Sequence, residues 1–174
     1  MSATTDPVRD AAAVLAGARL ADHFRRVHET MRDLPICNPR LDIAAIGFRS
    51  YGEHALGVIL TPWFMNLMIC AAGSDELAPR PVGETAYWPL PAGRVGFIVG
   101  RLDGFGRVDS CSLFSPMDDF VDDAAAHAVA VAALDELFDS APEDARDAAA
   151  RKSPTMDRRS LLFGAKRGLA NIAS

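Results

Sequence analysis

The hydrophobic positions near the start of the chain repeat with the period of an α-helix. Apolar side chains recur at intervals of three and four residues: Leu20, Phe24, Val27, Met31 and Leu34. This spacing places them on one face of a helix. Thr5 or Asp6 is suited to cap the first turn, and Pro7 suits the first helical position. The pattern predicts a helix from Pro7 to about Leu34, after a flexible N-terminus at residues 1–6.

Shorter apolar runs separated by turn residues follow this helix and predict strands. The predicted strands are Ile43–Ser50, Leu56–Thr61, Phe64–Ala71, a run of alternating residues from about Gly93, and Arg107–Phe114. Tyr51-Gly52-Glu53, Pro62-Trp63 and Asp103-Gly104 supply the turns. The polar stretch from Ser74 to Glu84 is predicted to be a loop.

A second helix is predicted from about Met117 to Asp139. The residues expected to share its apolar face are Phe120, Ala124, Ala128, Val131, Leu134 and Phe138. Four carboxylates would crowd its first turns: Asp118, Asp119, Asp122 and Asp123. Acidic side chains at this place complement the helix dipole. They would also suit a docking patch for a basic partner.

The order helix, strands, helix predicts an α+β fold. We expect one domain over residues 7–141, in which an antiparallel sheet carries both helices on one face. Residues 142–174 form a basic, apolar C-terminal tail that we expect to be partly ordered.

The composition of the chain excludes several classes of function. The 174-residue chain has a formal charge of −5, which argues against a nucleic-acid partner. Its N-terminus shows no secretory signal pattern. The three cysteines form no C-x-x-C pair, so no metal site is suggested. We expect them to be buried or free thiols of a cytoplasmic protein.

One uncharged stretch, from Ala55 to Ser74, approaches the length of a transmembrane helix. Gly57, Pro62 and Asn66 interrupt it, and its flanks are acidic rather than basic. We therefore expect strands here and no stable membrane insertion.

The bulkiest side chains of this stretch, Trp63, Phe64 and Met65, follow the proline at the predicted turn. Large apolar groups at a hairpin end are either tucked under a helix or exposed as a binding patch. The sequence leaves both readings open.

Three segments of the chain read "GVILTPWFMNLMI", "LPAGRVGFIVGRLDGFGRVDSCSLFSPM" and "RRSLLFG". In order and spacing they resemble segments of the HybE/HupJ family of [NiFe]-hydrogenase assembly chaperones, and the similarity spans about Ala45 to Gly164. The resemblance implies a cytoplasmic, non-enzymatic maturation factor for a membrane-bound uptake hydrogenase. Its partners would be the small-subunit precursor, with its twin-arginine signal peptide, or the large-subunit precursor, and binding would delay export until assembly is complete. Some relatives carry a rubredoxin-like domain with paired C-x-x-C ligands, which this chain lacks, so we expect no iron site and no cofactor.

Two hypotheses about sites follow from this resemblance. In the first, Asp118, Asp119, Asp122 and Asp123 attract the basic part of a signal peptide, and a surface around Trp63, Phe64 and Met65 covers its apolar part. In the second, the tail motif mimics the client and occupies the same groove; its residues are Arg158, Arg159, Leu161, Leu162 and Phe163.

Two other classes of protein remain as alternatives. One is a small-molecule-binding or cysteine-dependent acyl-transfer enzyme of α+β fold, with Cys111 as the nucleophile. The other is a dimerisation module that uses the first helix or the apolar hairpin.

Overall fold

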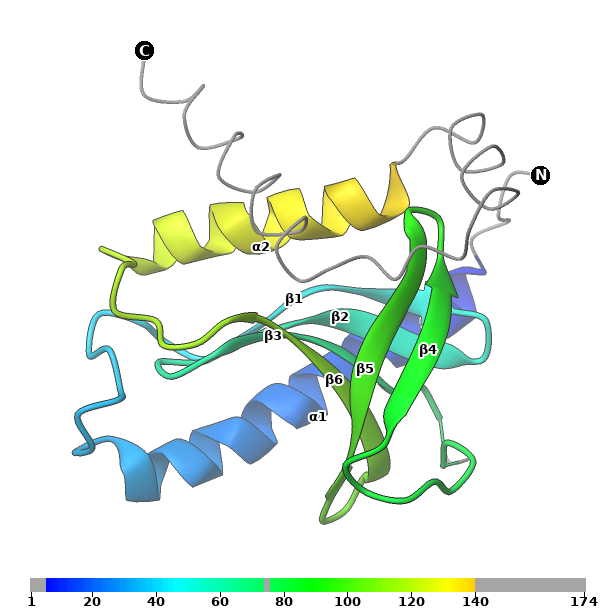
Figure 1. Ribbon diagram of the computed structural model, residues 1–174, viewed down its shortest axis with the longest axis horizontal. Coiled ribbons are helices and arrows are strands. Elements are labelled where there is room, and N and C mark those ends of the chain that lie inside the picture. The colour runs from blue at the N-terminus through cyan, green and yellow to red at the C-terminus, as the bar shows by residue number, and fades with distance from the viewer. Residues whose placement is uncertain (1–5, 74–75, 140–174) are drawn as a thin grey trace.

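The computed structural model describes residues 6–73 and 76–139. Its elements are α1 (Pro7–Met31), β1 (Ala44–Tyr51), β2 (His54–Leu60), β3 (Met65–Ala71), β4 (Thr85–Leu90), β5 (Gly93–Leu102), β6 (Gly106–Phe114) and α2 (Asp123–Phe138). The strands form one sheet in the order β1-β2-β3-β6-β5-β4, and every neighbouring pair is antiparallel. Two three-stranded meanders are thus joined where β3 pairs with β6 (Figure 1). The predicted α+β class is confirmed.

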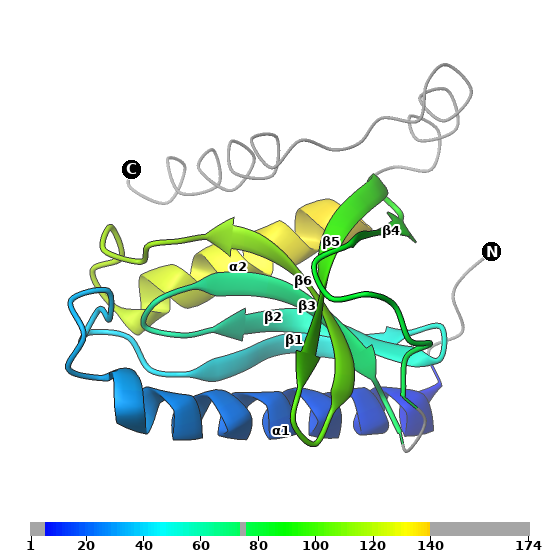
Figure 2. The same ribbon diagram turned by 60° about the horizontal axis from the view of Figure 1, so that its bottom comes forward.

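The two helices cover opposite faces of the sheet, so the expectation of a shared face is wrong. Figure 2 shows α1 on one side of the strands and α2 on the other. Strand β2 gives the physical reason, because it is apolar at successive positions. Leu56 and Val58 pack into the core under α2, whereas Ala55 and Ile59 pack into the core under α1. A strand buried on both faces needs a cover on each.

Helix α1 comes close to the sheet because two glycines make room for Phe48. A Cβ atom built on Gly17 of α1 would lie 2.5 Å from the Phe48 ring, and one built on Gly57 of β2 would lie 2.3 Å from it. Gly47 has a φ of 63°, and the β1–β2 register shifts beside it. This bulge places Phe48 in the core under α1, although Ile46 lies in the core under α2.

Strand β4 was not predicted from the sequence. Its Pro89 argues against a central strand, but proline is tolerated at a sheet edge, where β4 lies. Pro89 pairs with Arg94 of β5, and its carbonyl accepts a hydrogen bond from the Tyr51 hydroxyl of β1. The sheet therefore curls until its two edge strands touch through these side-chain and backbone groups.

Helix α2 begins later than predicted. Asp122 is its N-cap and accepts a hydrogen bond from the amide of Ala125 at 2.8 Å, so Asp118 and Asp119 precede the helix rather than lying in its first turns. The buried face consists of Ala126, Val129, Ala130, Ala133, Leu134 and Leu137. The predicted face shares only Leu134 with this set, because alanine and valine occupy most positions of this helix and spacing alone does not single out one apolar face.

Helix α1 matches its prediction more closely. Asp6 caps it and accepts a hydrogen bond from the amide of Val8. Leu20 and Phe24 are buried as expected, but the helix ends at Met31, and Leu34 is 47% exposed. Neither α1 nor α2 is both long enough and apolar enough to cross a bilayer.

Candidate functional site

Three segments that are distant in the sequence meet at one end of the molecule, and Asn38 holds them together. Asn38 is buried in the loop between α1 and β1. Its backbone amide donates to the carbonyl of Pro62 at 2.8 Å, in the β2–β3 turn. Its side-chain amide donates to the carbonyls of Met117 and Phe120, at 3.0 and 2.9 Å, in the segment before α2. The three segments lie at the left end of Figure 1.

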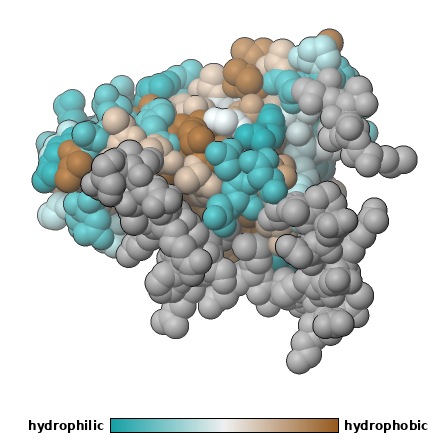
Figure 3. Space-filling view, turned by 90° about the horizontal axis from the view of Figure 1, so that it is seen from above, coloured by the Kyte–Doolittle hydropathy of each residue, from teal (hydrophilic) through white to brown (hydrophobic). Residues whose placement is uncertain are grey.

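The outside of this end combines apolar and acidic side chains. Leu34 and Ile36, in the loop that contains Asn38, are 47% and 49% exposed, and Val121, next to Phe120, is 64% exposed. Asp118 and Asp119 are also exposed. We call Leu34, Ile36, Asp118, Asp119 and Val121 the Asn38 surface. Figure 3 looks onto the face that carries α2, and at the left end of the molecule a hydrophobic group lies among hydrophilic ones.

The four aspartates of the predicted acidic patch differ in what they do. Asp122 caps α2, and the Asp123 carboxylate accepts the amide of Asp42 at 2.9 Å. Asp118 and Asp119 form no hydrogen bond or ion pair within residues 6–73 and 76–139. Only these two carboxylates are therefore available to a ligand without disturbing the loop structure.

The aromatic turn is tucked under α1 rather than left open. Trp63 and Phe64 are partly buried. The Trp63 ring lies 5.8 Å from that of His28, and the Phe64 ring lies 5.3 Å from that of Phe24 in an edge-on contact. Met65 is fully buried in the other core. Met65 therefore cannot belong to an exposed client-binding surface, because its side chain points into the protein at the start of β3.

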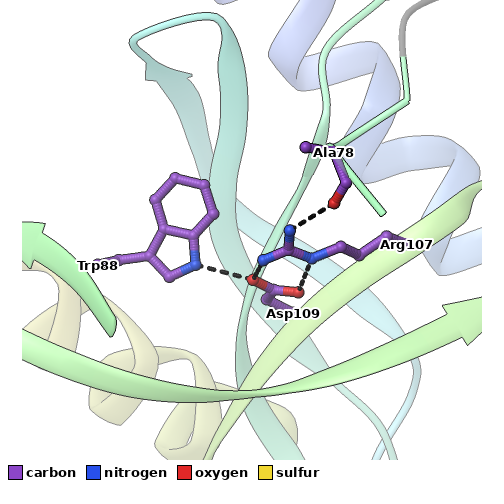
Figure 4. Close-up of polar contacts among 4 residues, drawn as sticks. All are labelled: Ala78, Trp88, Arg107 and Asp109. Atoms are coloured by element: carbon purple, nitrogen blue, oxygen red, sulfur yellow. Dashed lines mark hydrogen bonds and ion pairs between the residues drawn. The ribbon is translucent and has the colours of Figure 1, made fainter. Parts of the chain in front are cut away.

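A buried polar network lies near the β1–β2 turn, at the end of β2 that is remote from the Asn38 surface (Figure 4). Arg107 and Asp109 of β6 form an ion pair at 2.5 Å, and their side chains are 8% and 0% exposed. The Trp88 indole N–H donates to the same carboxylate at 2.8 Å. Arg107 also donates to the carbonyl of Ala78 at 2.6 Å. These contacts fix the loop before β4 to the sheet, and each charged group has a partner.

The burial of the three cysteines argues against a role as nucleophiles. Burial raises the pKa of the Cys70 thiol to about 11, against an opposing effect of Arg19, and burial also raises the pKa of Cys37. A reactive thiol needs the opposite shift. Cys111, the nucleophile of the enzyme alternative, is only 2% exposed. No group of three or more histidine, cysteine or acidic residues in the described part of the chain is arranged to hold a metal ion.

Two hollows lie away from the Asn38 surface. One of about 390 Å³ lies beside the start of α1, among polar residues such as Arg9, Ser50 and His54. The other, of about 240 Å³, lies between α1 and the β5–β6 turn and is lined by Arg19 and Phe105 among others. Both have mixed charges.

Comparison with known proteins identifies the family. The family model described as "[NiFe]-hydrogenase assembly, chaperone, HybE" matches residues 16–164. The chain belongs to this family of [NiFe]-hydrogenase assembly chaperones. It is 43% identical to the hydrogenase expression/formation protein HupJ of Bradyrhizobium diazoefficiens, over 91% of this chain and 93% of that protein. It is 31% identical to the hydrogenase-2 operon protein HybE of Escherichia coli K12, over 80% and 82% of the two chains.

Two further likenesses add detail to this family assignment. The chain is 37% identical to the probable rubredoxin HupJ of Rhodobacter capsulatus over 80% of its own length, but it spans only 51% of that protein. The solution structure of HybE from Escherichia coli has a TM-score of 0.50 at 24% identity, over 59% of this chain and 64% of that one. This last likeness supports the fold alone.

The Asn38 surface contains residues that the sequence analysis did not single out. Leu34 was assigned to the first helix, and Ile36 and Val121 were given no role. A signal was present, because Leu34 and Ile36 flank Pro35 in an irregular segment and Val121 lies among aspartates. Apolar residues in such surroundings have no regular element to bury them. The tail motif Arg158–Phe163 and the expected tail at residues 142–174 lie outside the described residues.

Proposed function

We propose that this chain is a cytoplasmic, non-enzymatic chaperone that binds hydrogenase precursor subunits at the Asn38 surface. The observation that carries the proposal is the exposure of Leu34, Ile36 and Val121 at the same end as Asp118 and Asp119, two carboxylates without partners among the described residues. Exposed apolar groups rimmed by charge are typical of protein-binding surfaces. Membership of a hydrogenase assembly chaperone family makes hydrogenase subunits the partners to test.

The chemistry of this surface suits the signal peptide of the small-subunit precursor. A twin-arginine signal places two cations before an apolar core. Asp118 and Asp119 would face the cations, and Leu34, Ile36 and Val121 would cover part of the core. Binding would keep the precursor from export until its metal centres are in place. The large-subunit precursor is the other partner to test.

Charge and apolar contact would play different parts in this binding. Carboxylates at the rim mainly raise the association rate, and salt screens their effect. Burial of apolar area contributes about 25 cal/mol per Å² and mainly slows dissociation. Trp63 would act from beneath, because its ring supports the β2–β3 turn whose Pro62 carbonyl binds Asn38. We therefore expect Trp63→Ala to change association little and to speed dissociation.

The test is a binding measurement with the small-subunit precursor and with the mature subunit that lacks the signal. Asp118→Lys with Asp119→Lys should slow association of the precursor about tenfold at low salt, and by less at high salt. Glu84→Lys with Asp103→Lys makes the same change of net charge at exposed residues outside this surface and should leave the rate near that of the wild type. Equal binding of precursor and mature subunit would contradict recognition of the signal peptide.

A further inference from the structure

The Asn38 surface is acidic and apolar, and the same chain carries a segment of opposite charge. Residues 151–174 contain six basic side chains and a single carboxylate: Arg151, Lys152, Arg158, Arg159, Lys166 and Arg167, against Asp157. The whole chain has a net charge of −5, so the rest of the molecule is strongly acidic. Attraction between the C-terminal segment and the folded domain is therefore expected from charge alone.

The order of residues in this segment matches the order of groups on the surface. Arg158 and Arg159 are separated by one residue, Ser160, from the apolar run Leu161, Leu162 and Phe163. On the domain, Asp118 and Asp119 are separated by one residue, Phe120, from the exposed Val121. Large apolar side chains next to paired cations are thus complementary to apolar groups next to paired carboxylates.

The chain is long enough for this contact. Helix α2 has 16 residues, which makes it about 24 Å long, and it begins at the Asn38 surface and ends away from it. Residues 140–157 separate its end from Arg158. Fully extended, 18 residues span at most about 60 Å, so the segment is long enough to bring Arg158 to the Asn38 surface. Attachment to the same chain makes this contact intramolecular and raises the effective concentration of the segment at the surface.

We propose that the segment Arg158–Phe163 binds the Asn38 surface of its own chain when no client is present. The family model includes this segment, since its match extends to residue 164. This binding would regulate access to the surface. It rests on the proposed function only where a hydrogenase precursor is named as the ligand that competes with the segment. A client would then bind only the fraction of molecules whose surface is open, which lowers its apparent affinity by that fraction.

The test uses full-length variants and a synthetic peptide of residues 157–168 as the probe. Arg158→Glu with Arg159→Glu should open the surface, so the probe should bind this variant at least tenfold more tightly than it binds the wild type. Lys166→Glu with Arg167→Glu makes the same charge change a few residues away and should leave probe affinity at the wild-type value. Amide NMR signals of Leu34, Ile36 and Val121 should shift in the first variant, while those of Tyr87 and Ile98, on the uncovered face of β4 and β5, should not.

Several outcomes would overturn the proposal. Equal probe affinity in the wild type and in Arg158→Glu/Arg159→Glu would show that the tail does not compete for the surface. The same gain from both double variants would reduce the effect to overall charge. NMR shifts that depend on protein concentration would assign the contact to a second copy of the chain. The probe contains no hydrogenase sequence, so tail binding without capture of any precursor would leave this inference standing and remove the client role.

Discussion

The polar side chains near the two ends of strand β2 differ in how far they are paired within the protein. At the end near the β1–β2 turn, Arg107, Asp109 and the Trp88 indole satisfy one another inside the protein. At the end near the β2–β3 turn, Asn38 is also buried and paired, but it holds loops whose outer side exposes apolar groups. Two carboxylates there have no partner in the part of the chain that the structure describes. The first end is closed and serves the fold. The second keeps its polar bonds inside and leaves its surface free for a ligand.

The largest expected effect is a loss of stability when the buried ion pair near the β1–β2 turn loses its carboxylate. Asp109→Ala would leave the Arg107 guanidinium buried without its carboxylate, and such changes cost about 3–5 kcal/mol of unfolding free energy. Chemical denaturation measures the loss. The double replacement Arg107→Met with Asp109→Leu removes both charges and should be more stable than the single variant. It should not reach wild-type stability, because the Trp88 indole N–H and the Ala78 carbonyl lose their partners. If the double variant is as unstable as the single one, the ion pair is not what the site depends on.

A smaller loss of stability is expected from Asn38→Ala, but with a functional effect that Asp109→Ala lacks. The change removes the Asn38 donor of the Phe120 carbonyl and one of the two donors of the Met117 carbonyl, which also accepts the amide of Phe120. Such a loss costs about 1–3 kcal/mol. Hydrogen exchange should speed up in the β2–β3 turn and in the segment before α2, and precursor affinity should fall in protein that remains folded. Unchanged exchange in these segments would show that Asn38 does not hold them.

Removing the exposed apolar groups should separate binding from stability. Leu34→Ser with Ile36→Ser should change the unfolding free energy by less than about 1 kcal/mol, because exposed side chains contribute little. It should weaken precursor binding about tenfold or more, as loss of central interface residues does. Tyr87→Ser with Ile98→Ser removes apolar groups of similar exposure from the other half of the sheet and should bind as the wild type does. Equal losses in both variants would indicate nonspecific adhesion.

The smallest expected effect is a pH dependence of the stability that the Asp10–Ser50 contact contributes near the β1–β2 turn. The Asp10 carboxylate accepts bonds from the hydroxyl and the amide of Ser50, at 2.6 and 2.8 Å, and these bonds lower the pKa of Asp10. The contact therefore stabilises the fold above the pKa of an unfolded aspartate, about 3.9, and is lost as pH falls through the lower folded pKa. In an NMR titration, Ser50→Ala should move the pKa of Asp10 up towards its ordinary value. No movement would mean that the hydroxyl bond is not the main cause.

The sequence predicted those parts of the fold that depend on local pattern. The start of α1, the hairpin at Asp103-Gly104 and the turn at Pro62 all follow from neighbouring residues. The placement of the helices on opposite faces was missed, although β2 carried the signal in its apolar residues on both faces. Strand β4 was missed because Pro89 is acceptable only at an edge, and an edge is a property of the whole sheet.

The candidate site was only partly predictable for the same reason. The aspartates and the aromatic turn, which the sequence analysis combined in one hypothesis, lie at the same end of the molecule. What brings them together is Asn38, whose bonds to Pro62, Met117 and Phe120 reach residues that are far away in the sequence. The burial of Met65 and the structural use of Asp122 and Asp123 depend on this tertiary arrangement, which no local pattern encodes.

The bond between Tyr51 and Pro89 limits how another polypeptide can attach to the edge of this sheet. Pro89 has no N–H to offer a further strand, and its carbonyl is already occupied. A bound chain therefore cannot lengthen the sheet beyond β4 by ladder pairing along the whole strand. Recognition through side chains tolerates many backbone shapes, which would suit the precursor subunits proposed above as partners.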